Sequence, residues 1–274
     1  MTADIITRTK RLARTIRGHT LRMVAKANAS HVGSCLSAAD LLAALHSGIL
    51  RIDSDRPDWA DRDRFLLSKG HAAAIYYAVL AECGFIPLSE LATYCADGSR
   101  LTGHVSHKVP GVEFSTGSLG HGLSIGCGMA LASRRDQKPW RVFVLLSDGE
   151  LDEGSTWEAV LFAAHNRLSN LVAIVDYNKI QSFGAVRNVL NLDPLAEKWR
   201  AFSWSVREID GHDVEQIADT FSSLPFDPAK PSAVIAHTVK GRGVSFMEND
   251  LAWHYRSPNT EQLQLALREV ESGV

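Results

Sequence analysis

Cysteine is scarce in this sequence of 274 residues, and the few cysteines present are widely separated. There are four, with no CxxC pair: Cys35, Cys83, Cys95 and Cys127. A zinc ribbon needs closely spaced cysteine pairs, and a disulfide framework needs a cysteine-rich short chain. Neither is expected here, and a reducing compartment, the cytoplasm, is the simplest prediction.

The sequence also has no long hydrophobic run. A membrane-spanning helix needs roughly 18 or more uninterrupted apolar residues, and no stretch approaches that length. The first 26 residues carry seven Lys or Arg and one acid, a bias shared by mitochondrial presequences. Apolar residues on one helical face and the lack of a small-residue cleavage site favour a structural first helix over residues 5–27 instead.

Charge of one sign is not in excess. The 29 Lys and Arg residues nearly balance 31 Asp and Glu residues, which leaves a formal charge of −2. A nucleic-acid-binding protein needs a cationic surface to contact phosphates, so nucleic acid is not expected as the main partner. With 45% hydrophobic and 22% charged residues, the composition is typical of a globular protein.

Hydrophobic patterning predicts an α/β fold with a parallel sheet flanked by helices, in a single domain spanning residues 1–274. Three β-rich runs are clear and two shorter ones are weaker: Trp140–Leu146, Asn170–Val175 and Ser232–Ala236, then Phe65–Ser68 and Ser203–Glu208. Besides residues 5–27, helices are predicted over Ser37–Leu50, Ala72–Cys83 and Ser155–Arg167. Ser37 is placed as the N-cap of its helix, with Asp40 as the acid of a capping box.

Two polar loops follow neighbouring predicted strands, at residues 147–154 and 176–181. Ligands of open parallel sheets bind at the carboxyl ends of the strands. Asp148, Asn178 and a backbone carbonyl form a hard oxygen set that suits Mg²⁺ or Ca²⁺, with open positions for a diphosphate. Gly149 allows close approach of an anion, and the helix starting near Ser155 directs its positive end there. The alternative is a plain cluster of caps and turns; an EF-hand is excluded by the register of the acids.

Histidine gives a second signal. His31, His71, His104 and His254 all lie in loops that contain Gly, Ser or Trp, not on apolar helix faces. Four such histidines on an α/β scaffold suggest a site that binds anionic or hydroxylated ligands and transfers protons. The glycine-rich run 117–128 does not match GxGxxG, so a nicotinamide dinucleotide fold is disfavoured.

Several tracts together resemble the transketolase family. Asp148 and Gly149, followed 30 residues after Asp148 by Asn178, resemble the thiamine diphosphate motif in which GDG precedes Asn. The segments that resemble transketolase occur in the order of that family: SHVGSCLSAADLLAAL (30–45), DRFLLSKGHAA (63–73), LTGHVS (101–106), GVEFSTGSLGHGLSIGCGMA (111–130), SDGELDEGSTWEA (147–159) and DYNKIQSFG (176–184). The resemblance extends from His31 to His254, nearly the whole chain.

The resemblance implies a role for each matching residue. Asp148, Asn178 and the carbonyl of Ile180 would hold Mg²⁺ (or Ca²⁺), and His71 and Gly149 would lie near the diphosphate of thiamine diphosphate. Gly117 and Leu119 match positions that line the thiamine pyrimidine. His31, His104 and His254 match catalytic histidines around the reacting sugar. Glu153 matches an acid that the family places at the interface between subunits.

Two departures from the family bear on the function. Ser147 replaces the first glycine of GDG, and the sequence resembles only the N-terminal, diphosphate-binding part of full transketolases. The pyrimidine-binding domain, which supplies the glutamate that activates the cofactor, is expected on another chain. The resemblance thus implies the diphosphate-binding subunit of a split transketolase, an A₂B₂ enzyme active only with its partner. It would transfer a two-carbon ketol unit from a ketose phosphate to an aldose phosphate.

Three alternatives stay open. One is the α subunit of a thiamine-dependent 2-oxo acid dehydrogenase, which shares the cofactor-binding half but not the LTGHVS and STGSLGHG tracts. The second is half of an enzyme similar to deoxyxylulose-phosphate synthase, to which the tract HTVKGRG (237–243) has some likeness. The third is a non-catalytic scaffold, which retention of the metal and histidine motifs opposes. The sequence does not assign roles to Lys240 and Arg242.

Overall fold

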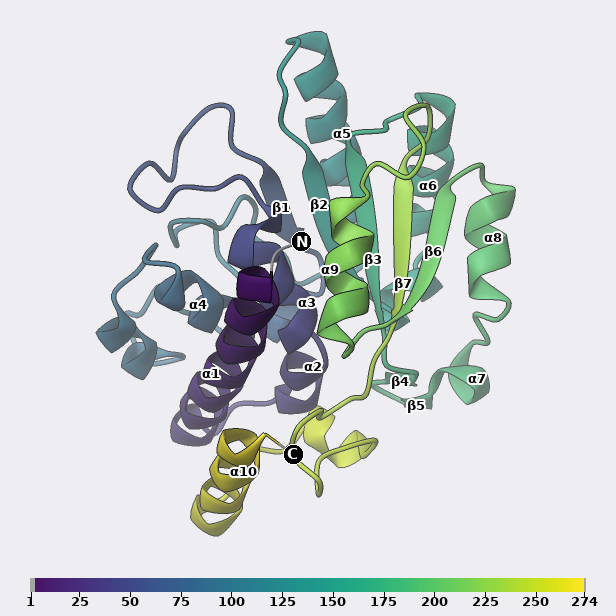
Figure 1. The fold of residues 1–274 in the computed structure, drawn as a ribbon. Coiled ribbons are helices and arrows are strands. Elements are labelled where there is room, and N and C mark those ends of the chain that lie inside the picture. Colours follow the sequence, from purple (N-terminus) through teal and green to yellow (C-terminus); the bar gives the residue numbers. More distant parts are fainter. Residues whose placement is uncertain (1–2, 274) are drawn as a thin grey trace.

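Five parallel strands form a central sheet, which runs through the middle of the molecule in Figure 1. The computed structural model describes residues 3–273. The strands, in spatial order, are β1 (Arg64–Leu67), β2 (Val142–Ser147), β3 (Leu171–Tyr177), β7 (Ser232–His237) and β6 (Ser205–Asp210). All five predicted strands are present, with ends within two residues of those expected. The predicted fold class, a parallel sheet flanked by helices, is confirmed.

The sequences of β2, β3 and β7 are apolar on both sides because both faces of the sheet are covered at these strands. Successive side chains of a strand point to opposite faces, so alternate residues enter different cores. Phe143, Leu145, Val172 and Ile174 belong to one core, whereas Val142, Val144, Ala173 and Val175 belong to the other. Every residue of β2 and β3 is buried.

The first core lies beneath six helices: α1 (Ala3–Ala27), α2 (Val32–Ser37), α3 (Ala39–Ala44), α4 (Ala73–Glu82), α9 (Val214–Ser222) and α10 (Thr260–Ser272). The second core lies beneath α5 (Gly122–Arg135), α6 (Gly154–His165) and α8 (Leu195–Ala201). In Figure 1, α9 lies in front of the sheet and α6 behind it, whereas α10 lies beyond the lower end of the sheet, and it contacts α1. No helix among residues 3–273 is long and apolar enough to cross a membrane.

Short elements fill the connections near the carboxyl edge of the sheet and beyond the helices. They are a π-helical turn (Leu45–Ile49), four 3₁₀ turns (Gly70–Ala72, Leu88–Thr93, Gly149–Asp152 and Leu251–His254), α7 (Val186–Val189), and the two-residue strands β4 (Ile180–Gln181) and β5 (Gly184–Ala185). The latter two pair antiparallel in a hairpin of their own.

The predicted helix Ser37–Leu50 is wrong at its start. Helical structure begins at Val32, and Ser37 is the last residue of α2 instead of an N-cap. The Ser37 hydroxyl donates to Asp176, a distant residue at the end of β3, and Asp40 pairs with Arg17 of α1. Tertiary partners in a buried segment have replaced the local capping contacts that the sequence pattern suggested.

Helices α5, α8, α9 and α10 are absent from the sequence-based prediction. In α5 the reason is glycine, which lowers helix propensity by about 1 kcal/mol relative to alanine. A Cβ atom on Gly126 would lie 2.7 Å from Val144 of β2, so glycine allows α5 to lie directly on the sheet. Gly126 is therefore explained by close packing of α5 against β2.

We expect Gly126→Ala to destabilise the chain by about 1–3 kcal/mol, because the new methyl group overpacks the rigid core beside Val144. Gly128→Ala is the matched control on the same helix, since a Cβ there meets nothing within 4 Å. The control should stabilise by about 0.5–1 kcal/mol through helix propensity. Urea unfolding of both variants measures the difference, and equal effects would contradict the close packing of α5.

Candidate cofactor-binding site

A cavity of about 440 Å³ lies at the carboxyl ends of the strands, lined by segments that follow β1, β2, β3 and β7. All eleven residues singled out from the sequence line it: His31, His71, His104, Gly117, Leu119, Asp148, Gly149, Glu153, Asn178, Ile180 and His254. They come from segments up to 223 residues apart in the chain. The structure therefore brings every predicted site residue together, although their individual roles stay predictions.

A buried ion pair lies beneath the cavity. Lys69, just after β1, donates to Asp176 at the end of β3, and both side chains are fully inaccessible to solvent. Burial alone would raise the pKa of the Asp176 carboxyl. The charge of Lys69, together with the hydrogen bonds that the carboxylate accepts, holds that pKa below its ordinary value instead. A charge pair that is removed from water this completely must be well bonded to remain ionised.

Three further contacts tie neighbouring segments to this pair. Lys69 Nζ also donates to the Ser34 carbonyl at 2.9 Å, and Ser37 Oγ donates to Asp176 Oδ2 at 2.6 Å, both from α2. The Thr238 hydroxyl, just after β7, donates to Asp176 Oδ1. The ion pair thus connects α2, β1, β3 and β7 at the edge of the sheet where the cavity lies.

Oxygen ligands suited to a hard cation lie on the two loops after β2 and β3. Asp148 accepts from the backbone of Gly149 at 2.8 Å and from that of Lys179 at 2.6 Å. Asn178 Oδ1 accepts from the Ile180 backbone at 3.1 Å. These bonds fix the side chains and leave each oxygen a further lone pair. Burial, together with the nearby charge of Asp176, raises the pKa of Asp148 to about 6.

A cation bound here would find one carboxylate, one amide oxygen and one carbonyl. Among residues 3–273, no group of three or more His, Cys, Asp or Glu residues could hold a metal ion. The remaining ligands of a metal at Asp148 would therefore be water and the oxygens of a bound molecule, as is usual for Mg²⁺ at a phosphate site. This donor set fits the group that the sequence motif implies.

Lys240 contributes positive charge to the same site. Its ammonium donates to the Ile180 carbonyl at 2.8 Å and contacts His254 Nδ1 at 3.0 Å. Burial lowers the pKa of Lys240 to about 8, an effect that the charge of Asp148 opposes. A cation beside the carboxylate loop favours an anionic ligand.

The predicted histidines form one cluster on the wall of the cavity. The ring of His31 lies 5.3 Å from His71, 5.8 Å from His104 and 5.0 Å from His254, measured between centroids. Burial lowers the pKa of His31 to about 4, with His104 adding to the shift. Burial and the charge of Lys240 lower the pKa of His254 to about 3. Neutral imidazoles of this kind can both accept and donate protons.

The glycine-rich loop before α5 is held against the cavity by buried polar contacts. Gly120, at a φ of 83°, donates its backbone N–H to Glu150 Oε1 at 2.9 Å, and its carbonyl accepts from Ser155 at 2.9 Å. Glu150 also accepts from the Ser68 hydroxyl, while its second oxygen has no partner among the described residues. Burial raises the pKa of Glu150 to about 7. This loop carries Gly117, where a Cβ atom would lie 3.3 Å from His104.

Sequence reasoning missed several residues that line or support the cavity. Lys69 lies within a tract that resembles transketolase, but nothing in the sequence gives it a role of its own. Glu150 is a single acid in an acidic loop, which carries no distinctive signal, and Lys240 has no assignment from sequence. The other unassigned lining residues are Ser34, Ser147, Asp152, Gln181, Ser182, Phe183 and Val189.

Comparison with known proteins shows the family. Residues 8–268 match the sequence model of the transketolase thiamine diphosphate-binding domain. The chain belongs to the transketolase family. Over 258 residues it is 42% identical to one of the subunits of apulose-4-phosphate transketolase of Phocaeicola vulgatus, covering 94% of this chain and 92% of that protein. It is 41% identical to the 6-deoxy-6-sulfo-D-fructose transketolase subunit SqwG of a Clostridium species, with 94% of each chain covered.

Solved transketolases show the same fold in a longer chain. The crystal structure of transketolase from Campylobacter jejuni superposes with a TM-score of 0.91 at 29% sequence identity. The superposition covers 99% of this chain but 43% of the Campylobacter chain, so this chain spans less than half of that transketolase. In contrast, this transketolase chain matches the Phocaeicola and Clostridium subunits over nearly their whole length.

These comparisons establish the general function. The chain is a transketolase subunit, a transferase component with a thiamine diphosphate-binding domain, and the naming of its relatives as subunits implies a second chain. The predicted assignment to transketolase is therefore confirmed, and it is favoured over the alternative of a 2-oxo acid dehydrogenase subunit.

Proposed function

We propose that this chain, as a single diphosphate-binding domain over residues 1–274, holds thiamine diphosphate through Mg²⁺ and works with a separate pyrimidine-binding subunit. Together they would transfer a two-carbon ketol unit from a ketose phosphate to an aldose phosphate. The observation that carries the proposal is the single cavity at the carboxyl edge of the sheet. It combines an oxygen donor set, a buried cation and four histidines.

The metal would be held by Asp148, Asn178 and the Ile180 carbonyl. Two of these groups are already oriented by backbone hydrogen bonds, so little side-chain freedom is lost on binding. Lys240 and His71 lie on the same cavity and suit the anionic diphosphate. Gly149 lines the same cavity, and its lack of a side chain would let the diphosphate come close to the backbone there.

The histidines would handle protons and sugar hydroxyls. When bound, thiamine diphosphate supplies the nucleophilic carbon that carries the two-carbon unit. Burial lowers the pKa of His31 to about 4 and that of His254 to about 3, so both are neutral at pH 7, and burial also lowers the pKa of His104. The contact with the Lys240 ammonium fixes His254 Nδ1 as an acceptor, so Nε2 carries the proton and would donate to a bound ligand.

The partner would complete the cavity from the side that this chain leaves open. Glu153 lies on that cavity and is proposed to meet the neighbouring subunit, with an A₂B₂ assembly as the expected stoichiometry. Phe183, on the hairpin that lines the cavity, is 84% exposed, so a partner that covers the opening would bury a large apolar side chain. The four unpaired cysteines fit a cytoplasmic enzyme.

We propose the chemical class of the ketose substrate, not an individual sugar. The Phocaeicola and Clostridium subunits are named for a phosphorylated and a sulfonated ketose, respectively. Both substrates carry an anionic tail on a ketose. A ketose with a phosphate or sulfonate tail is therefore the substrate class that we assign to this enzyme.

We expect Asp148→Asn to abolish Mg²⁺-dependent binding of thiamine diphosphate. Asparagine is preferable to alanine here because Asp148 is 2% exposed and accepts two backbone hydrogen bonds, one of which the amide oxygen can retain. Asp152→Asn, on the same cavity but outside the donor set, is the control. Calorimetric titration with and without EDTA measures the affinity, and an unchanged affinity in Asp148→Asn would refute the metal assignment.

We expect the purified chain to show no ketol transfer alone, even with thiamine diphosphate, Mg²⁺ and a mixture of sugar phosphates. Affinity purification from the native host should recover a second chain with a pyrimidine-binding domain, and adding that chain should restore activity. The same complex built with Asp148→Asn controls for contaminating enzyme. Turnover by this chain alone would contradict the need for a partner.

A further inference from the structure

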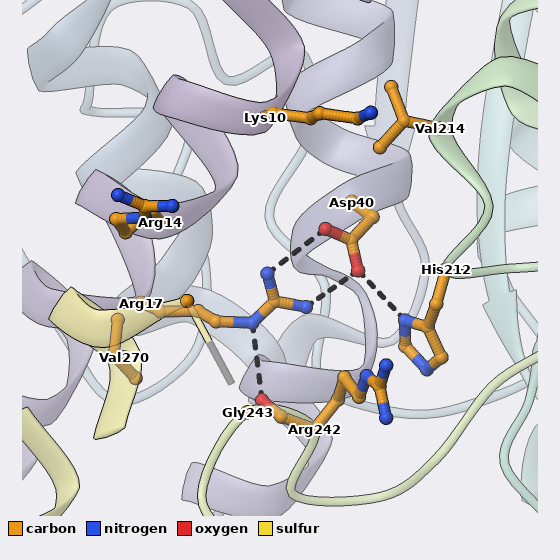
Figure 2. Close-up of a pocket in the computed structure, with 10 residues that line it drawn as sticks. Lys10, Arg14, Arg17, Asp40, His212, Val214, Arg242, Gly243 and Val270 are labelled. Atoms are coloured by element: carbon orange, nitrogen blue, oxygen red, sulfur yellow. Dashed lines mark hydrogen bonds and ion pairs between the residues drawn. The ribbon is translucent and has the colours of Figure 1, made fainter.

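A second cavity, of about 210 Å³, lies away from the cofactor site (Figure 2). It is enclosed by α1, α3, the start of α9, the end of α10 and the segment that follows β7. It shares no lining residue with the cofactor cavity. Nothing in the function proposed above uses its side chains.

The floor of this cavity is a buried and fully bonded network. Arg17 donates to both oxygens of Asp40, at 3.0 and 2.6 Å, and to the Arg242 carbonyl at 3.2 Å. His212 Nδ1 lies 2.8 Å from Asp40, and its Nε2 accepts from the Val239 backbone at 2.8 Å. Because Nε2 is an acceptor, the proton lies on Nδ1 and the ring is neutral. The single negative charge of Asp40 therefore balances only the positive charge of Arg17.

Three cations remain around this floor with little compensation. Lys10 and Arg14 occupy successive turns of α1 and are exposed, and Arg242 lies across the cavity from Lys10 in Figure 2. Arg14 has no hydrogen bond or ion pair within the described part of the chain. Among residues 3–273, the Lys10 ammonium has one long ion pair, 3.9 Å to Glu215, and the Arg242 guanidinium has one, 3.4 Å to Glu248.

Such an arrangement is unfavourable without a ligand. Like charges four residues apart on a helix destabilise it by about 0.2–0.5 kcal/mol, and a third cation faces them across a concave surface. A cleft lined by one sign of charge concentrates ions of the opposite sign. Arg17, held rigidly by Asp40, gives the cavity a fixed floor, so its shape does not depend on the ligand.

We propose that this cavity binds a phosphate group, either free phosphate or the phosphate monoester of a small metabolite. Guanidinium and ammonium groups donate several charge-assisted hydrogen bonds to a phosphate, and Arg14 and Arg242 approach from different elements. The volume suits a ligand of this size, since it is below the roughly 300–1,000 Å³ of pockets for drug-sized molecules. The site lies outside the cofactor cavity, so both can be occupied at once.

The test is equilibrium dialysis of the full chain, saturated with thiamine diphosphate and Mg²⁺, against radiolabelled inorganic phosphate and against glucose 6-phosphate. We expect saturable binding of one probe molecule per chain, weakened by at least about tenfold in Arg14→Ala, because Arg14 donates only to the ligand. Lys10→Ala should also weaken binding of the probe. Tighter binding of the ester would identify a monoester site, and stronger binding of free phosphate an orthophosphate site.

Arg11→Ala is the matched control. Arg11 is an exposed arginine on α1, three residues from Arg14, and does not line the cavity. Its removal should leave the affinity unchanged, and thermal unfolding of all three variants verifies that they are folded. Lack of saturable binding of both probes up to about 10 mM, or equal losses in Arg14→Ala and Arg11→Ala, would overturn the proposal.

Discussion

The buried ion pair between Lys69 and Asp176 is the constraint on which the functional edge of this transketolase chain depends. Both groups are excluded from solvent, so neither tolerates the loss of its partner. Their additional bonds to α2 and to Thr238 determine how four segments meet at the carboxyl ends of the strands. His71 and Asn178 each lie two residues beyond a member of the pair, and His31 directly precedes α2, so the pair holds in place the backbone from which these cavity-lining side chains extend.

A rigid edge of this kind suits a protein that provides half of an active site. The chain presents a carboxylate, an amide, a lysine, histidines and two glycines on one cavity. Asp148, Asn178 and Lys240 are already oriented by hydrogen bonds to the backbone. Binding energy is then available for positioning the substrate and for recruiting the partner chain instead of ordering the site.

The sequence predicted the sheet and the contents of the cofactor cavity well, because both depend on local signals. Apolar runs such as Val142–Leu146 indicate buried strands, and the motif residues follow strand ends directly. Side-chain contacts between distant residues could not be predicted from the sequence. Ser37 and Asp176 are 139 residues apart, and the contact of Arg17 with Asp40 depends on how two helices pack against each other. Helix α5 was not predicted because it contains several glycines, and the packing of one of them, Gly126, against Val144 of β2 is visible only in the structure.

The most direct test of this account is the free energy of unfolding of Lys69→Met, measured by urea denaturation beside Arg56→Met. The first variant removes the charge from the buried pair, whereas the second removes it from an ion pair with Asp53 in which Arg56 is 64% exposed. We expect a loss of about 3–5 kcal/mol for Lys69→Met and about 0–1 kcal/mol for Arg56→Met. Similar small losses in both would contradict the organising role of the buried pair.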